Sequence, residues 1–102
     1  MNESPTPAVT RKNIGIRFLY TILYLIVLEI LKILIQLTSL FQFIYLLLTL
    51  KYSEPARKFS NRVAAYGYRV MRYLTLNDNV RPFPFSDFPQ ELEPPVSEVR
   101  FD

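Results

Sequence analysis

Glu29 and Lys32 are the two charged residues within a long apolar stretch, and they are the first candidates for chemistry in this sequence. The 33 residues from Phe18 to Leu50 contain no Gly, no Pro and no other charged residue. A spacing of three places both side chains on one face of a helix, where they can pair. Ionisable groups in a membrane are costly, which makes them candidates for ion paths or helix–helix specificity. The alternative is an ion pair that reaches the lipid headgroups.

Uncharged polar residues form a second set in the same stretch. In lipid, such side chains hydrogen-bond between helices, so they either hold two helices of this chain together or bind another subunit. The intramembrane polar candidates are Glu29, Lys32, Gln36 and Gln42.

The chain has no Cys, His or Trp, and this absence excludes most catalytic chemistry. It removes a thiolate nucleophile, an imidazole base and a His/Cys zinc site. Glu29 and Lys32 have no third group to orient them for acid–base work. We therefore expect no enzyme, no metal and no cofactor, and we rank a small transporter or pore subunit that uses Glu29 below a binding role.

The apolar stretch predicts a membrane protein. As one helix it would measure about 50 Å, against a hydrocarbon core of about 30 Å. Basic residues flank it on both sides, and the positive-inside rule places both flanks in the cytoplasm. The expectation is a membrane hairpin over residues 14–52, with helices at about 15–35 and 38–52 and a reversal near 36–39. A single tilted span and a re-entrant insertion are the alternatives.

Residues 53–76 predict an amphipathic helix at the membrane surface. Ser53 suits a helix N-cap, Glu54 the positive end of the helix, and Pro55 its first turn. Apolar residues recur at spacings of three and four and share an arc: Phe59, Val63, Tyr66, Val70 and Tyr73. Cations border this arc, as on helices that lie on anionic membranes. The lipid-binding candidates are Lys58, Arg62, Arg69, Arg72, Tyr66 and Tyr73.

Charge divides the chain into a basic part and an acidic tail. Residues 1–76 hold ten Lys/Arg and three Asp/Glu, a net charge of +7, whereas residues 77–102 hold two and six, a net charge of −4. The tail also has five of the eight prolines, so we expect it to be extended, and we expect residues 1–13 to form a disordered basic arm. Anionic lipid is nearer to the cations than nucleic acid, which we do not expect as a partner.

The most distinctive local pattern is the alternation of Pro and Phe at residues 81–89. Such a segment favours a polyproline-like strand that displays aromatic rings to a groove in a partner. The alternative is that it folds back on the chain's own helices. The partner-binding candidates are Arg81, Pro82, Phe83, Pro84, Phe85, Asp87 and Phe88.

These features together resemble a family of bacterial membrane proteins classed as domain of unknown function 4389. The resemblance runs from about Arg17 to Pro89 and is most specific in the Pro-Phe-Pro-Phe-Ser-Asp stretch. It implies an inner-membrane protein of Gram-negative bacteria without an established activity. Leu50 stands where relatives tend to have a Gly at a helix end, and Phe88 stands where a Trp is expected.

The sequence thus predicts an all-α membrane protein: a transmembrane helical hairpin, an interfacial amphipathic helix and an extended Pro/Phe-rich tail. The expected function is that of a noncatalytic accessory or scaffold protein in the bacterial inner membrane, with both termini in the cytoplasm. It would bind the anionic inner leaflet and, through its tail, a protein partner; a homo-oligomer is also compatible. The alternative is a lipid-binding or lipid-sensing module that uses the basic helix.

Overall fold

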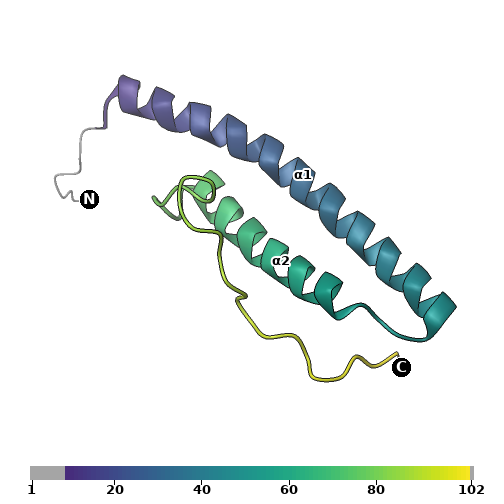
Figure 1. The fold of residues 1–102 in the computed structure, drawn as a ribbon. Coiled ribbons are helices and arrows are strands. Elements are labelled where there is room, and N and C mark those ends of the chain that lie inside the picture. The colour runs from purple at the N-terminus through teal and green to yellow at the C-terminus, as the bar shows by residue number, and fades with distance from the viewer. Residues whose placement is uncertain (1–8, 102) are drawn as a thin grey trace.

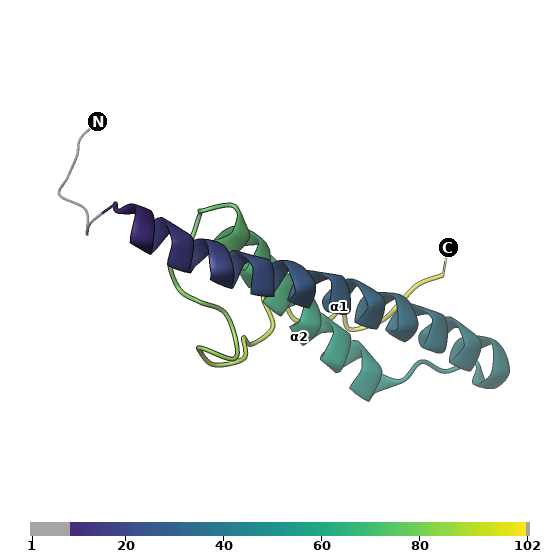
Figure 2. The same cartoon turned by 90° about the horizontal axis from the view of Figure 1, so that it is seen from above.

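The computed structural model describes residues 9–101 and is all-helical. It has two helices, α1 from Arg11 to Thr49 and α2 from Glu54 to Leu74, and no strand among the described residues. The helices lie side by side and antiparallel, and the segment after α2 folds back along them (Figures 1 and 2). The all-α prediction is confirmed.

The predicted reversal near residues 36–39 is wrong, because α1 is a single helix. No residue in this segment breaks a helix, and the Thr38 hydroxyl donates to the Leu34 carbonyl (2.8 Å), a bond within the helix. Thr10 caps the start of α1 by accepting from the Asn13 N–H (3.1 Å). Residues 11–13 therefore belong to α1 and not to the predicted disordered arm, whose residues 1–8 lie outside the described residues.

The chain reverses instead at residues 50–53. Leu50 ends α1 in the left-handed conformation (φ 59°), and its N–H donates to the Leu46 carbonyl at 2.7 Å. Gln42 then holds the backbone of Ser53 on both sides: its Oε1 accepts the Ser53 N–H (2.8 Å) and its Nε2 donates to the Ser53 carbonyl (2.9 Å). Gln42 thus fixes the turn inside the chain and does not lie on an outer face of α1.

α2 begins as its sequence predicts. The Ser53 hydroxyl accepts from the Ala56 N–H (3.3 Å), Glu54 lies in the first turn, and Pro55 occupies a first-turn position that needs no N–H donor. Glu54 also pairs with Arg57 at 2.9 Å.

The apolar face of α2 packs on α1 and not on lipid. Tyr24 and Leu31 of α1 form the core with four residues of α2: Val63, Tyr66, Val70 and Tyr73. The inward positions of α1 recur every seven residues as Arg17, Tyr24, Leu31 and Thr38, the period of a two-helix coil. The prediction that Tyr66 and Tyr73 contact lipid is therefore wrong, since their exposed fractions are 6% and 2%.

Replacing Leu50 by Gly should stabilise the protein. A left-handed conformation costs a residue with a Cβ about 1–2 kcal/mol, and Gly avoids this cost. Leu50 is 88% exposed, so little packing is lost. We expect L50G to raise the free energy of unfolding by about 1 kcal/mol, measured by denaturant unfolding followed by circular dichroism.

The matched control is L48G, at a position that is 79% exposed but lies within α1. It should lower the free energy of unfolding by about 0.5–1 kcal/mol, because Gly has more freedom to lose in a helix. Equal stability of L50G and the wild-type chain would contradict the expected relief of strain.

Candidate functional site

Two tyrosine hydroxyls hold the Pro-Phe loop, which we define as residues 81–89. Tyr24 of α1 donates to the Pro82 carbonyl and Tyr66 of α2 donates to the Phe83 carbonyl, both at 2.6 Å. Tyr24 is completely buried. Burial raises the pKa of the Tyr66 phenol, so its hydroxyl stays protonated at neutral pH and can donate. We call this pair of hydrogen bonds the tyrosine clamp.

Aromatic rings pack the loop against both helices. Phe85 meets Tyr20 of α1 edge to face, with 5.3 Å between ring centroids. The ring centroid of Phe88 lies 5.2 Å from that of Tyr66 and 5.4 Å from that of Phe83. Such pairs contribute about 0.5–1.5 kcal/mol each beyond the area that they bury. The loop is therefore a folded part of the molecule.

Two arginines extend this packing. The Arg81 guanidinium lies 4.1 Å from the Tyr20 ring centroid, and that of Arg62 lies 4.9 Å from the Phe88 ring centroid. The Phe85 N–H donates to the Pro82 carbonyl (3.1 Å), which closes a turn. The prediction of an extended, polyproline-like segment is wrong, and the fold-back alternative describes the structure.

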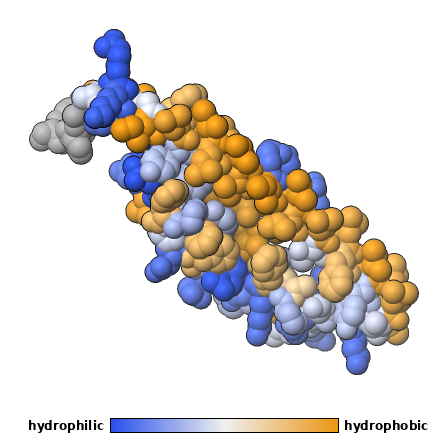
Figure 3. All heavy atoms as spheres, turned by 45° about the horizontal axis from the view of Figure 1, so that its top comes forward, coloured by the Kyte–Doolittle hydropathy of each residue, from blue (hydrophilic) through white to orange (hydrophobic). Residues whose placement is uncertain are grey.

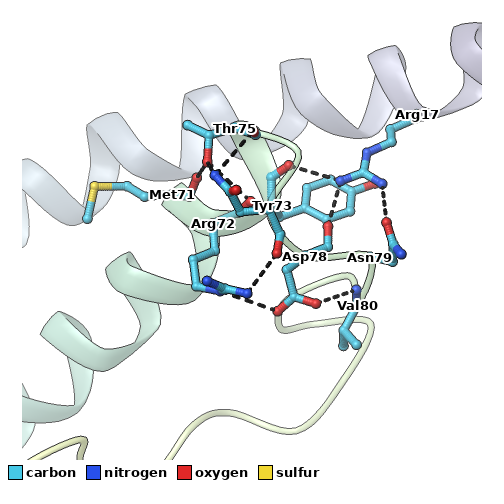
Figure 4. A network of polar contacts seen from close by, with 9 residues as sticks. Arg17, Met71, Arg72, Tyr73, Thr75, Asp78, Asn79 and Val80 are labelled. Carbon is cyan, nitrogen blue, oxygen red and sulfur yellow. Dashed lines mark hydrogen bonds and ion pairs between the residues drawn. The ribbon is translucent and has the colours of Figure 1, made fainter. Parts of the chain in front are cut away.

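Arg17 joins the start of α1 to the end of α2 (Figure 4). One terminal nitrogen donates to the carbonyls of Tyr73 (3.1 Å) and Asp78 (2.6 Å), and the other donates to Asn79 Oδ1 (2.9 Å). The guanidinium also lies 4.4 Å from the Tyr73 ring centroid. A cation at this position complements the negative end of the α2 dipole. Sequence reasoning counted Arg17 only as a flanking charge; its seven-residue spacing from Tyr24 was the signal for its inward position.

Asp78 organises the chain just after α2. Its Oδ1 accepts the Val80 N–H at 3.1 Å, and its Oδ2 lies 4.0 Å from Arg72 Nε. The Val80 hydrogen bond, supported by the charges of Arg72 and Arg69, lowers the pKa of the Asp78 carboxyl.

The predicted lipid-binding cations have different environments. Arg62 and Arg72 hold the returning chain through the carbonyls of Pro89 (3.4 Å) and Asn77 (2.7 Å). Lys58 and Arg69 are exposed. Arg69 also lines a cavity together with Asp78.

The predicted intramembrane polar residues separate into two groups. Glu29 and Lys32 pair at 3.1 Å as predicted, with side chains 66% and 62% exposed, and Gln36 is exposed one turn further along. Gln42 alone turns inward, to Ser53.

A cavity of about 480 Å³ lies between the Pro-Phe loop and α2. Its walls include the rings of Tyr66, Phe83 and Phe88 and the charged side chains of Arg69 and Asp87. No group of three His, Cys, Asp or Glu residues that could hold a metal lies together in residues 9–101. The cavity offers aromatic surface with charges of both signs.

Removing the Tyr66 hydroxyl should loosen the Pro-Phe loop. In Y66F the Phe83 carbonyl loses its donor, at a cost of about 1–2 kcal/mol. We expect faster hydrogen exchange at the Phe85 amide, by about fivefold or more, measured by mass spectrometry on the loop peptide. Y68F is the control, because Tyr68 is 43% exposed and has no hydrogen bond to the loop. Equal exchange in Y66F and Y68F would show that the clamp does not restrain the loop.

Asp78 makes a contribution to stability that depends on pH. Because its folded-state pKa lies below the unfolded value of about 3.9, this contribution is complete above the unfolded pKa and is lost as pH falls through the folded pKa. D78N keeps an acceptor for the Val80 N–H but removes the charge. The stability difference between wild type and D78N should be constant from pH 7 to about 5 and shrink below about pH 4, measured by urea unfolding. A difference that persists at the lowest pH would contradict this assignment.

A family model described as Domain of unknown function (DUF4389) matches residues 11–86, which include both helices and both clamped carbonyls. No curated protein and no solved structure matches the chain.

Proposed function

This chain belongs to the DUF4389 family, and we propose that it is a noncatalytic accessory protein that lies on the inner leaflet of the bacterial cytoplasmic membrane. In this proposal α1 lies in the plane of the membrane with one face in lipid. α2 and the Pro-Phe loop stay on the aqueous side.

The observation that carries the proposal is the uncovered apolar face of α1. α1 is long and apolar enough to cross a membrane, yet only 11% of its most apolar 18-residue window is buried. Residues that recur at spacings of four and three form a stripe without any polar member, 38–79% exposed: Leu19, Leu23, Ile26, Ile30, Ile33, Leu37, Leu40, Ile44 and Leu48. We call this the lipid stripe. Figure 3 shows a hydrophobic band along the molecule, and an apolar surface of this extent marks an interaction site.

α2 supports an in-plane orientation rather than a spanning one. It is packed along α1 and carries five cations: Arg57, Lys58, Arg62, Arg69 and Arg72. Moving each of them to the bilayer centre costs about 2.5–3.5 kcal/mol, even on the most favourable scale. With α1 in the plane, the lipid stripe enters the acyl chains while these cations remain in water or at headgroups.

Charge supports the inner leaflet as the surface. The net charge of +7 over residues 1–76 favours an anionic membrane, and Lys58 and Arg69 of α2 are exposed. The face that would contact lipid is that of α1, so this differs from a module that binds lipid through the apolar face of α2.

A protein partner at the Pro-Phe loop is the second part of the accessory role. Its supporting observation is that Phe83 and Phe85 stay 42% and 54% exposed while the tyrosine clamp fixes their backbone. Rings held in a fixed loop lose little entropy on binding.

Tryptophan fluorescence can measure the depth of α1 in a bilayer, because the chain has no Trp of its own. Single Trp residues replace Leu19, Ile33 and Leu48, which span about 44 Å along the axis of α1. In vesicles of phosphatidylglycerol and brominated phosphatidylcholine, we expect similar quenching at all three positions, because an in-plane helix keeps one depth.

Y68W, on the outer face of α2, is the control and should remain unquenched. Deep quenching at residue 33 with shallow positions at 19 and 48 would show that α1 spans the membrane. Absence of quenching at all three would exclude membrane attachment.

A further inference from the structure

Beside the lipid stripe, α1 has a second exposed stripe that contains the charged pair. It consists of two interleaved series with seven-residue spacing. One series is Phe18, Leu25, Lys32 and Ser39. The other is Ile22, Glu29, Gln36 and Phe43. All eight residues are exposed, and we call this face the seam; at its end, Phe43 lines a cavity together with Phe101 of the tail. The alternation of spacings of four and three is the pattern by which a helix packs on another helix.

The seam and the lipid stripe differ in chemistry. The lipid stripe has no polar residue, whereas the seam contains Glu29, Lys32, Gln36 and Ser39. Within residues 9–101, Glu29 and Lys32 have only each other as charged partners, at 3.1 Å, and about two thirds of each side chain is exposed. Acyl chains offer these groups no hydrogen bonds, so packing the seam against protein lowers the free energy of a membrane-bound α1.

The order of residues in the seam is complementary to itself when reversed. If a second α1 lies antiparallel with the two-fold axis between residues 30 and 31, Glu29 faces Lys32 of the second copy, and Lys32 faces its Glu29. Moving outward, Leu25 faces Gln36, Ile22 faces Ser39, and at both ends Phe18 faces Phe43. Each residue of one series meets a residue of the other, as in antiparallel coiled coils, and no like charges meet.

We propose that the seam binds a second copy of this chain in an antiparallel dimer, with Glu29 and Lys32 of both copies forming a ring of four alternating charges. Each carboxylate gains a second ammonium and each ammonium a second carboxylate, so the ring is neutral. The lipid stripes and the Pro-Phe loops remain outside the contact. The stability of this dimer rests on the proposed membrane attachment, because the attraction between opposite charges is strongest where lipid replaces water.

Disulfide cross-linking can test the geometry in the full chain, which has no cysteine of its own. L25C and Q36C are prepared separately, bound to vesicles of phosphatidylglycerol and phosphatidylcholine or dissolved in detergent, and oxidised alone or mixed. In an antiparallel dimer, residues 25 and 36 of different copies face each other, whereas two residues 25 are about 16 Å apart along the axis. We expect a cross-linked dimer from the mixture only.

The matched control is the pair I26C and L37C, which has the same eleven-residue separation but lies on the lipid stripe. It should not cross-link when mixed. Self-cross-linking of L25C, equal yields from the two pairs, or no cross-link in vesicles and in detergent would each overturn the proposed dimer. Vesicle-bound protein that fails to cross-link would leave the proposed membrane attachment intact.

Charge reversal tests the ring of charges. E29K and K32E alone should each weaken the dimer at least tenfold in Kd, measured by energy transfer between labelled copies, because four like charges would meet at the axis. Mixing E29K with K32E should restore a heterodimer, and the double variant E29K/K32E should restore the homodimer. Equal dimer affinity in all variants, or failure of both the mixture and the double variant to recover it, would overturn the proposal.

Discussion

The burial of Tyr24 is the constraint on which the rest of the structure depends. Its ring lies edge-on to Tyr73 of α2, with 5.4 Å between centroids, and its hydroxyl donates to the Pro82 carbonyl. The Tyr24 side chain thus connects α1 both to α2 and to the Pro-Phe loop. A buried hydroxyl without a partner costs about 1–3 kcal/mol. The packing of α2 on α1 buries the Tyr24 side chain, and the fold-back of the Pro-Phe loop supplies the Pro82 carbonyl that accepts from its hydroxyl.

The position of α2 determines what α1 can do. Because α2 covers one side of α1, the other sides become distinct surfaces: an entirely apolar stripe and a stripe centred on Glu29 and Lys32. Because α2 is polar on its outer side, it also opposes the entry of α1 into the bilayer as a spanning helix. In our proposals, orientation in the membrane and assembly with a second copy therefore both depend on one intramolecular contact.

Several local features were predictable because their causes are local. The Ser53 cap, the acidic first turn and Pro55 mark the start of α2, and a spacing of three is enough to pair Glu29 with Lys32. The family could also be identified from residues alone, chiefly from the Pro-Phe motif.

The reversal of the chain was less predictable, because a short segment of polar residues does not by itself break a helix. Residues 36–39 resemble a turn only by polarity, and the helix continues through them since nothing removes a backbone donor or requires a positive φ. The actual turn depends on Gln42, eleven residues from its partner Ser53, and on packing between the helices. The fold-back of the loop depends on Tyr24 and Tyr66, whose contacts with it join residues 58 and 17 positions apart.

The sequence by itself determined that this chain is helical, that α1 is apolar along its length, that α2 is amphipathic, and that the acidic tail is rich in proline. Only the tertiary structure decided which apolar face is covered by the chain itself: that of α2, which packs on α1. A lipid surface and a neighbouring helix remove the same apolar area from water, so periodicity cannot distinguish them. The choice was made by contacts between distant residues. The rings of Tyr24 and Tyr73 pack on each other, and the hydroxyls of Tyr24 and Tyr66 donate to carbonyls of the loop, partners that acyl chains do not provide.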